Sequence, residues 1–133
     1  MLSDQITLAV DVLNDGVTEN HVFNKMEVFL NRSIYIEDNH QPELRDTLHF
    51  YRTFPKVVGN FRGTRKTSFK ISKDVLVSGV DGTSNLTVPV IAEVGFSIPI
   101  GVDEASRKII RQRLIALLDD DSLMEKLTNV QMV

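Results

Sequence analysis

The amino-acid sequence predicts an α+β fold in a single domain of residues 1–133. Up to residue 100, apolar residues alternate with polar ones in successive segments, and this period of two is typical of half-buried strands. After Gly101 the apolar period lengthens to about 3.6, which is typical of a helix with one buried face. Strands that all precede the helices indicate an antiparallel sheet. We therefore expect an N-terminal β-hairpin and an antiparallel meander sheet over residues 1–100, followed by two C-terminal helices over residues 103–131.

The predicted strands are separated by turn and loop signals. The first strand covers Ile6 to Val12 and ends at Asn14-Asp15-Gly16, a sequence typical of hairpin turns. Further strands are expected over residues 22–30, 33–37, 47–54, 66–77 and 88–100. Pro89 and Pro99 are expected to bracket the last strand, because proline cannot donate a hydrogen bond to a sheet. Residues 78–85 are rich in Gly, Ser and Asp, so we expect a flexible loop there.

The two helices are expected to carry an interface. Asp103 and Glu104 place acidic groups where the first helix begins, and Ser122 is expected to cap a shorter second helix. Apolar residues recur at helical spacing, and the candidate interface residues among them are Ile110, Leu114, Leu117 and Leu118. Because two short helices are a thin cover for a sheet of five or more strands, the pattern favours a two-fold dimer whose helices cross onto the partner. Helices that fold back on their own sheet are the alternative.

Several classes of function lack their sequence signals. Zero Cys residues exclude a disulfide framework, a thiolate metal site and a cysteine nucleophile. The three His residues lack zinc-site spacing, and no catalytic motif is present, so we expect neither an enzyme nor a cofactor, metal or small-molecule substrate. Asp4 stands where a signal peptide would be basic, and no apolar run approaches the roughly 18 residues of a membrane span. We therefore expect no export signal and no membrane partner.

Positive charge is concentrated in the middle of the chain, although the whole chain carries a formal net charge of −3. Between Arg45 and Lys73 there are eight Lys and Arg residues and one acidic residue, whereas the rest of the chain has 7 basic and 17 acidic residues. Aromatic residues are interleaved with these charges. Basic side chains neutralise phosphates, and aromatic rings stack on unpaired bases, so the block favours nucleic-acid binding. The alternative is a solvated strand face whose charges keep a sheet edge from aggregating.

Two segments resemble a known family. Ser97-Ile98-Pro99-Ile100-Gly101-Val102-Asp103-Glu104-Ala105-Ser106-Arg107-Lys108, continuing to Leu118, is similar to the C-terminal part of the coat proteins of single-stranded RNA bacteriophages, the leviviruses. Arg65-Lys66-Thr67-Ser68-Phe69-Lys70-Ile71 resembles the Arg-Lys strand of that family, and residues 79–85 stand in the place of its loop between the last two strands. The order of the predicted elements is similar to that of the family over nearly the whole chain, whereas the amino acids themselves are similar in these two segments.

The resemblance implies a viral capsid protein of the virion. Two chains would form an interlocked dimer, and dimers would assemble in the host cytoplasm into an icosahedral shell around single-stranded viral RNA. The inner sheet face would also bind an RNA hairpin and repress translation of the replicase gene. The loop that would contact neighbouring dimers comprises Ser78, Gly79, Val80, Asp81, Gly82, Thr83, Ser84 and Asn85.

The resemblance also implies candidate RNA-binding residues. The Arg-Lys strand would contribute Arg65, Lys66, Ser68, Lys70 and Ser72, and the preceding strand would contribute His49, Tyr51 and Thr53. Ile91 and Glu93 stand where family members have an aromatic residue and an Asn that hold a looped-out base, so the sequence departs from the family there.

Two other functions fit the basic block. One is a non-capsid RNA-binding regulator with a basic sheet platform. The other is an interaction module whose basic strands dock an acidic partner.

Overall fold

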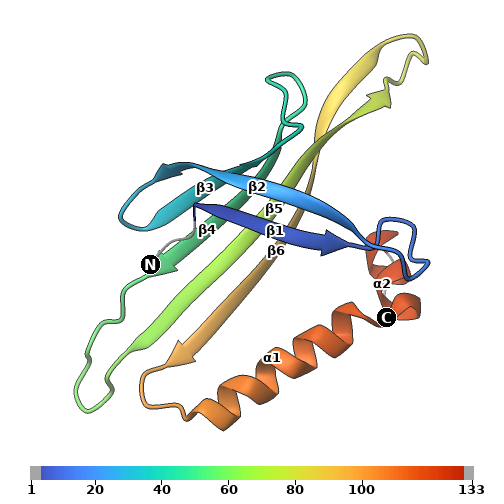
Figure 1. Cartoon of the computed structure of the whole chain (residues 1–133). Helices are drawn as coiled ribbons and strands as arrows, with labels where there is room; N and C mark the ends of the chain where they lie inside the picture. The colour runs from blue at the N-terminus through green and yellow to red at the C-terminus, as the bar shows by residue number, and fades with distance from the viewer. Residues whose placement is uncertain (1–3, 131–133) are drawn as a thin grey trace. The chain divides into compact units, whose positions relative to one another are not determined.

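The computed structural model describes residues 4–130 and confirms that the strands precede the helices (Figure 1). Within these residues the strands are β1 (Gln5–Val10), β2 (Glu19–Val28), β3 (Arg32–Glu37), β4 (Asp46–Thr53), β5 (Thr64–Ser78) and β6 (Asn85–Pro99). They form one sheet in chain order, and the pairs from β1 to β5 are antiparallel. The predicted meander is therefore confirmed.

The helices α1 (Glu104–Leu118) and α2 (Asp121–Thr128) follow the sheet. The chain divides into two compact units: the sheet unit runs through Pro55 and from Arg65 to Ser97, and the second unit comprises Lys56–Thr64 and the chain from Ile98 onward. In the second unit, the amide of Ile100 donates to the carbonyl of Gly63 over 3.0 Å. The predicted helical region extends to residue 131, which lies outside the described residues.

Two of the predicted boundaries are wrong. Pro89 lies inside β6 and does not precede it. This position is tolerated because β6 lies at the edge of the sheet, where part of the backbone has no neighbouring strand to pair with. Asp120 caps α2 in place of Ser122, because its carboxylate accepts a hydrogen bond from the Leu123 amide over 3.1 Å. The predicted start of α1 is confirmed, with Asp103 as its cap.

The core of the sheet unit lies on one face, which we call the core face. Phe23, Tyr35 and Leu48 are buried there, with Ile6 and Phe50 packed against them. In Figure 1 the blue hairpin of β1 and β2 crosses the later strands at a steep angle. The contacts of Ile6 and Phe23 with the residues from β3 and β4 show that this hairpin packs over the core face.

An irregularity in β2 accompanies this crossing. Lys25 pairs with Tyr35, but Glu27 pairs with Ile34, so Met26 is an extra residue in the β2–β3 ladder. A bulge of this kind bends its strand and increases the local twist. Because two residues of β2 oppose one of β3, the alternation of the two faces shifts by one residue at Met26. Odd-numbered residues of β2 lie on the core face before Met26, and the even-numbered Val28 lies on it afterwards.

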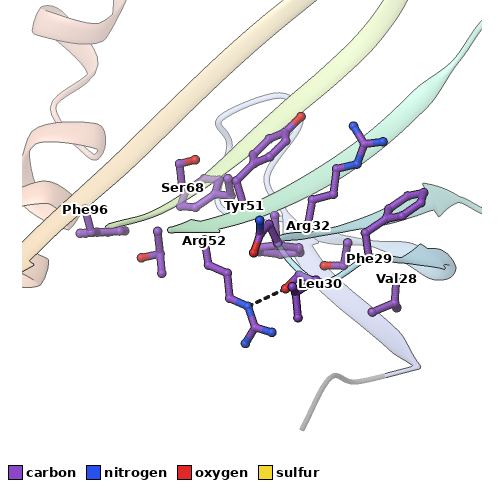
Figure 2. A pocket seen from close by; sticks show the side chains of 13 residues that line it. Val28, Phe29, Leu30, Arg32, Tyr51, Arg52, Ser68 and Phe96 are labelled. Carbon is purple, nitrogen blue, oxygen red and sulfur yellow. Dashed lines mark hydrogen bonds between the residues drawn. The ribbon is translucent and has the colours of Figure 1, made fainter. Parts of the chain in front are cut away.

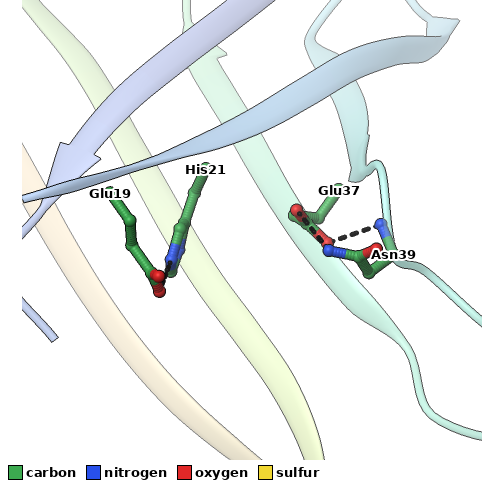
Figure 3. A network of polar contacts seen from close by, with 4 residues as sticks. All are labelled: Glu19, His21, Glu37 and Asn39. Atoms are coloured by element: carbon green, nitrogen blue, oxygen red, sulfur yellow. Dashed lines mark hydrogen bonds and ion pairs between the residues drawn. The ribbon is translucent and has the colours of Figure 1, made fainter.

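One end of the core face is polar (Figure 3). Glu19 and His21 of β2 form a pair at 2.9 Å, and the buried Glu37 of β3 accepts a 2.7 Å hydrogen bond from the Asn39 amide. Asp46 lies on this face opposite Lys73. Burial raises the pKa of the Asp46 carboxyl above its usual value, and the nearby Glu37 carboxylate adds to this effect.

The loop between β5 and β6 is a compact turn. The Asp81 carboxylate accepts hydrogen bonds from the amides of Thr83 and Ser84, each over 3.0 Å, and from the Ser84 hydroxyl over 2.8 Å. These hydrogen bonds lower the pKa of Asp81 to about 2. The amide of Gly79 also donates to the carbonyl of Ser84, so the loop has a defined conformation, although its composition indicates flexibility.

Candidate nucleic-acid interface

The face of the sheet opposite the core presents two rows of polar side chains, and we call it the basic face. The register pairs the β4 residues of this face directly with those of β5: Thr47 with Ser72, His49 with Lys70, Tyr51 with Ser68, and Thr53 with Lys66. Residues paired in this way lie on one face with their Cβ atoms roughly 5 Å apart. The structure therefore brings together seven of the predicted RNA-binding residues from these two strands, with Thr47 beside them.

Ring and cation contacts organise the centre of the basic face. The rings of His49 and Tyr51 are stacked at 6.1 Å between centroids with an interplanar angle of 9°, and the Lys70 ammonium lies 5.9 Å from the centroid of the Tyr51 ring. His49 Nε2 also lies 3.1 Å from the hydroxyl of Thr47. These contacts place aromatic faces and a positive charge at one location, which is the combination that binds unpaired nucleotides.

The electrostatics of His49 follow from its position. Its side chain is half-buried, and burial lowers the pKa of its imidazole below the usual value. The positive charges of Lys70 and Arg32 lower this pKa further. The ring is therefore neutral at pH 7, and the positive charge of the face comes from its Lys and Arg side chains.

Arg32 belongs to this face, although sequence reasoning did not single it out. It pairs with Tyr51 in the register of β3 with β4, and its guanidinium lies 4.5 Å from the centroid of the Phe29 ring. It lies outside the basic block of the sequence, so only the pairing of β3 with β4 could have identified it. Arg65 is the reverse case, because it precedes Lys66 in β5 and strand alternation turns its side chain to the opposite face.

Strand β6 extends the basic face beyond β5. A side chain at Gly95 would have its Cβ atom 3.9 Å from that of Ser68, so Gly95 lies on this face, and strand alternation places Ile91 and Glu93 there too. Ile91 lines a groove of about 730 Å³ together with Ile34, Thr47 and His49. Both apolar and polar side chains line this groove, and Glu93 adds a negative charge to the face.

A second hollow of the sheet unit, of about 340 Å³, lies at the turn between β2 and β3 (Figure 2). Its lining includes Val28 at the end of β2, Phe29 and Leu30 of the turn, and Phe96 of β6. Arg52 holds this turn, because its Nε donates a 2.9 Å hydrogen bond to the Leu30 carbonyl. This hollow is mainly apolar, and Arg32, Tyr51 and Ser68 of the basic face also line it.

The described residues contain no cluster of three or more His, Asp or Glu side chains arranged to hold a metal ion. Across residues 4–130, none of the helices has both the length and the apolar character needed to cross a membrane. The basic face is a sheet surface on which β5 presents the positive charges of Lys66 and Lys70 beside the β4 residues.

Comparisons with known proteins relate this sheet to solved particle structures. No family model matches the sequence, and no curated protein matches it significantly. The virus-like particle of bacteriophage AVE019 matches with a TM-score of 0.77 at 19% identity, over 96% of this chain and 95% of that chain. The virus-like particle of bacteriophage ESE058 matches with a TM-score of 0.76 at 15% identity, over 100% of this chain and 99% of that one.

A levi-like virus gives a third match. The virus-like particle of Wenzhou levi-like virus 4 has a TM-score of 0.73 at 22% identity, and the match covers 98% of this chain and 88% of that chain. These matches run through both the sheet and the helices, which confirms the resemblance at the level of the fold. The chain has the fold of the proteins that form the virus-like particles of levi-like phages and viruses.

Proposed function

We propose that this protein is the coat protein of a single-stranded RNA virus, a structural component of the virion that encloses the viral RNA. The observation that carries the proposal is the match over nearly the full length of both chains to proteins of virus-like particles. The basic face supports the RNA-binding part of the proposal through its charges and stacked rings.

Self-assembly is supported by the amount of apolar surface that a single chain leaves exposed. Within the described residues only Phe23, Tyr35 and Leu48 are buried hydrophobics, and α1 has no buried residue. Of the predicted interface residues, Ile110, Leu117 and Leu118 are exposed and Leu114 is half-buried. Apolar surface of this extent is characteristic of chains that are stable only as oligomers. We therefore assign these helix residues to a dimer interface. The resemblance to the coat-protein family supports assigning residues 78–85 to contacts between dimers.

Electron microscopy of the purified full-length protein tests the shell. Uniform closed particles that contain RNA are expected. Discrete dimers without particles would contradict the coat function and favour the alternative of a non-capsid RNA-binding regulator. Leu117→Asp is expected to abolish both particles and soluble dimer, because it places a charge in the assigned interface. A folded monomer of the wild-type protein in analytical ultracentrifugation would contradict the dimer.

RNA binding has a matched test within one strand. The double variant Lys66→Ala/Lys70→Ala removes two charges from the basic face, whereas Arg65→Ala/Lys73→Ala removes two charges of the same sign from the other face of β5. Filter binding over a salt series is expected to show weaker binding for the first variant, with the salt dependence reduced by about one unit for each lysine. The second variant is expected to bind much as the wild type does. Equal losses in both variants would remove the basic face as the RNA site.

Binding of one particular RNA hairpin, with repression of translation, is the finer part of the proposal. The groove beside His49 and Ile91 is large enough to receive a base. The negative charge of Glu93, however, opposes the approach of phosphates. We therefore expect a hairpin preference that differs from that of family members with Asn at this position.

A further inference from the structure

We propose that His49 makes RNA binding at the basic face proton-dependent, so that RNA is held more tightly in mildly acidic solution than at neutral pH. This inference rests on the proposed RNA-binding function and adds a means of regulation to the same face. Its structural basis is the placement of a titratable ring at the centre of the face, where it contacts other candidate RNA-binding groups.

His49 occupies the middle of a cross-strand row. Its register neighbours are Ile34 on β3 and Lys70 on β5, and its ring stacks on Tyr51 of its own strand. The distance of 3.1 Å from Nε2 to the Thr47 hydroxyl fixes the orientation of the ring. A proton gained by this ring therefore adds a positive charge beside Lys70 and the stacked rings.

The charged groups around His49 come from every neighbouring strand. Arg32 on β3 and Lys70 on β5 are the positive groups whose charges act on the imidazole. Glu27 on β2 lies on the same face, one strand beyond Ile34, and Glu93 lies on this face of β6. The groove that His49 lines also contains His40, Arg45 and Asp74.

In the free protein these surroundings keep the ring neutral, because burial and the two nearby positive charges disfavour the imidazolium form. The phosphates of bound RNA would bring negative charge to the same face and favour that form. Binding then raises the pKa of His49, and linkage requires that a ligand which promotes proton uptake binds more tightly as the pH falls. A single proton limits the gain in affinity to about tenfold for each pH unit.

The test is the affinity of the full-length protein for a fluorescently labelled single-stranded RNA between pH 8.0 and pH 5.5, at constant ionic strength. The wild type is expected to bind several-fold more tightly at the acidic end, within the limit set by one proton. His49→Phe keeps an aromatic ring next to Tyr51 but cannot gain a proton, so its affinity is expected to be nearly constant over this range. His21→Gln, on the core face, is the matched control and is expected to keep the pH dependence of the wild type.

A second measurement does not depend on the variants. The pKa of the His49 imidazole, followed by NMR in the wild-type protein, is expected to be higher with RNA than without it. A pKa that RNA leaves unchanged, or a pH dependence that persists in His49→Phe, would overturn this inference while leaving RNA binding intact. RNA that fails to bind at any pH would overturn the proposed RNA-binding function itself, and this inference with it.

Discussion

Neighbouring residues of β4 serve opposite faces of one sheet. Leu48 and Phe50 lie on the core face against Tyr35, whereas His49 and Tyr51 lie on the basic face beside Lys70. The two tyrosines show the difference. Tyr35 is 1% exposed and makes an edge contact with the Phe50 ring, whereas the side chain of Tyr51 is only half-buried. Because the faces alternate residue by residue, stability and RNA binding can be changed separately by substitutions one position apart.

The largest expected effect separates the two tyrosines. Tyr35→Ala removes the most deeply buried side chain of the core face and is expected to lower the free energy of unfolding by about 3–5 kcal/mol, because it leaves a cavity. Tyr51→Ala is expected to lower it by about 1 kcal/mol or less. Urea unfolding of both variants measures the difference. Equal losses would show that the basic face also belongs to the folding core.

A second prediction changes a charge on the basic face without changing the fold. Glu93→Asn removes a negative charge near the path of the phosphates and is expected to tighten RNA binding several-fold, equivalent to about 1 kcal/mol. Filter binding at low and high salt measures the effect, which is expected to shrink as salt screens the charge. Glu19→Gln makes the same type of change on the core face and is expected to leave RNA affinity unaltered. A tightening in that control would point to net charge and not to position.

A third prediction concerns the polar end of the core face. The raised pKa of Asp46 means that the folded state holds the proton more tightly than the unfolded state does. The Asp46 carboxyl therefore favours folding most at acidic pH, and this contribution is lost as the pH rises through its folded pKa. Asp46→Asn is expected to be more stable relative to the wild type at pH 7 than at pH 4, as measured by urea unfolding at both values. A constant difference between the two proteins would show that attraction to the Lys73 charge cancels the effect of burial on the Asp46 carboxyl.

The smallest expected effect lies in the loop between β5 and β6. Asp81→Ala removes the acceptor for the amides of Thr83 and Ser84, so these amides are expected to exchange with solvent faster. The low pKa of Asp81 means that the hydrogen bonds persist above about pH 4 and are lost as the pH falls toward 2. Hydrogen exchange followed by NMR measures the change. The unfolding free energy and the RNA affinity are expected to stay close to those of the wild type.

Alternation and turn signals were enough to predict the order of the elements and the two faces of β4 and β5, and the acidic pair Asp103-Glu104 was enough to predict where α1 begins. They did not predict the register of the strand pairs, because register depends on contacts between distant segments. For this reason Arg32, remote from the basic block, was missed. Arg65 was grouped with its neighbour Lys66 because the resemblance implied the Arg-Lys strand as a unit, although alternation places the two on opposite faces. The cap of α2 was misplaced because Asp119, Asp120, Asp121 and Ser122 all have side chains suited to capping. The composition of residues 78–85 indicates only flexibility, so it did not predict the hydrogen bonds that the Asp81 carboxylate accepts within the loop.

The bulge at Met26 has a consequence for insertions and deletions in β2. Phe23 and Val28 are an odd number of residues apart, yet the register places both on the core face, with Glu37 and Ser33 respectively. In a regular strand they would lie on opposite faces. Loss of the single codon for Met26 would therefore leave a regular ladder in which Phe23 and Val28 both stay on the core face, and the local bend of the strand would be lost. Substitution of the Met26 side chain, which is half exposed, would keep both the extra residue and the bend.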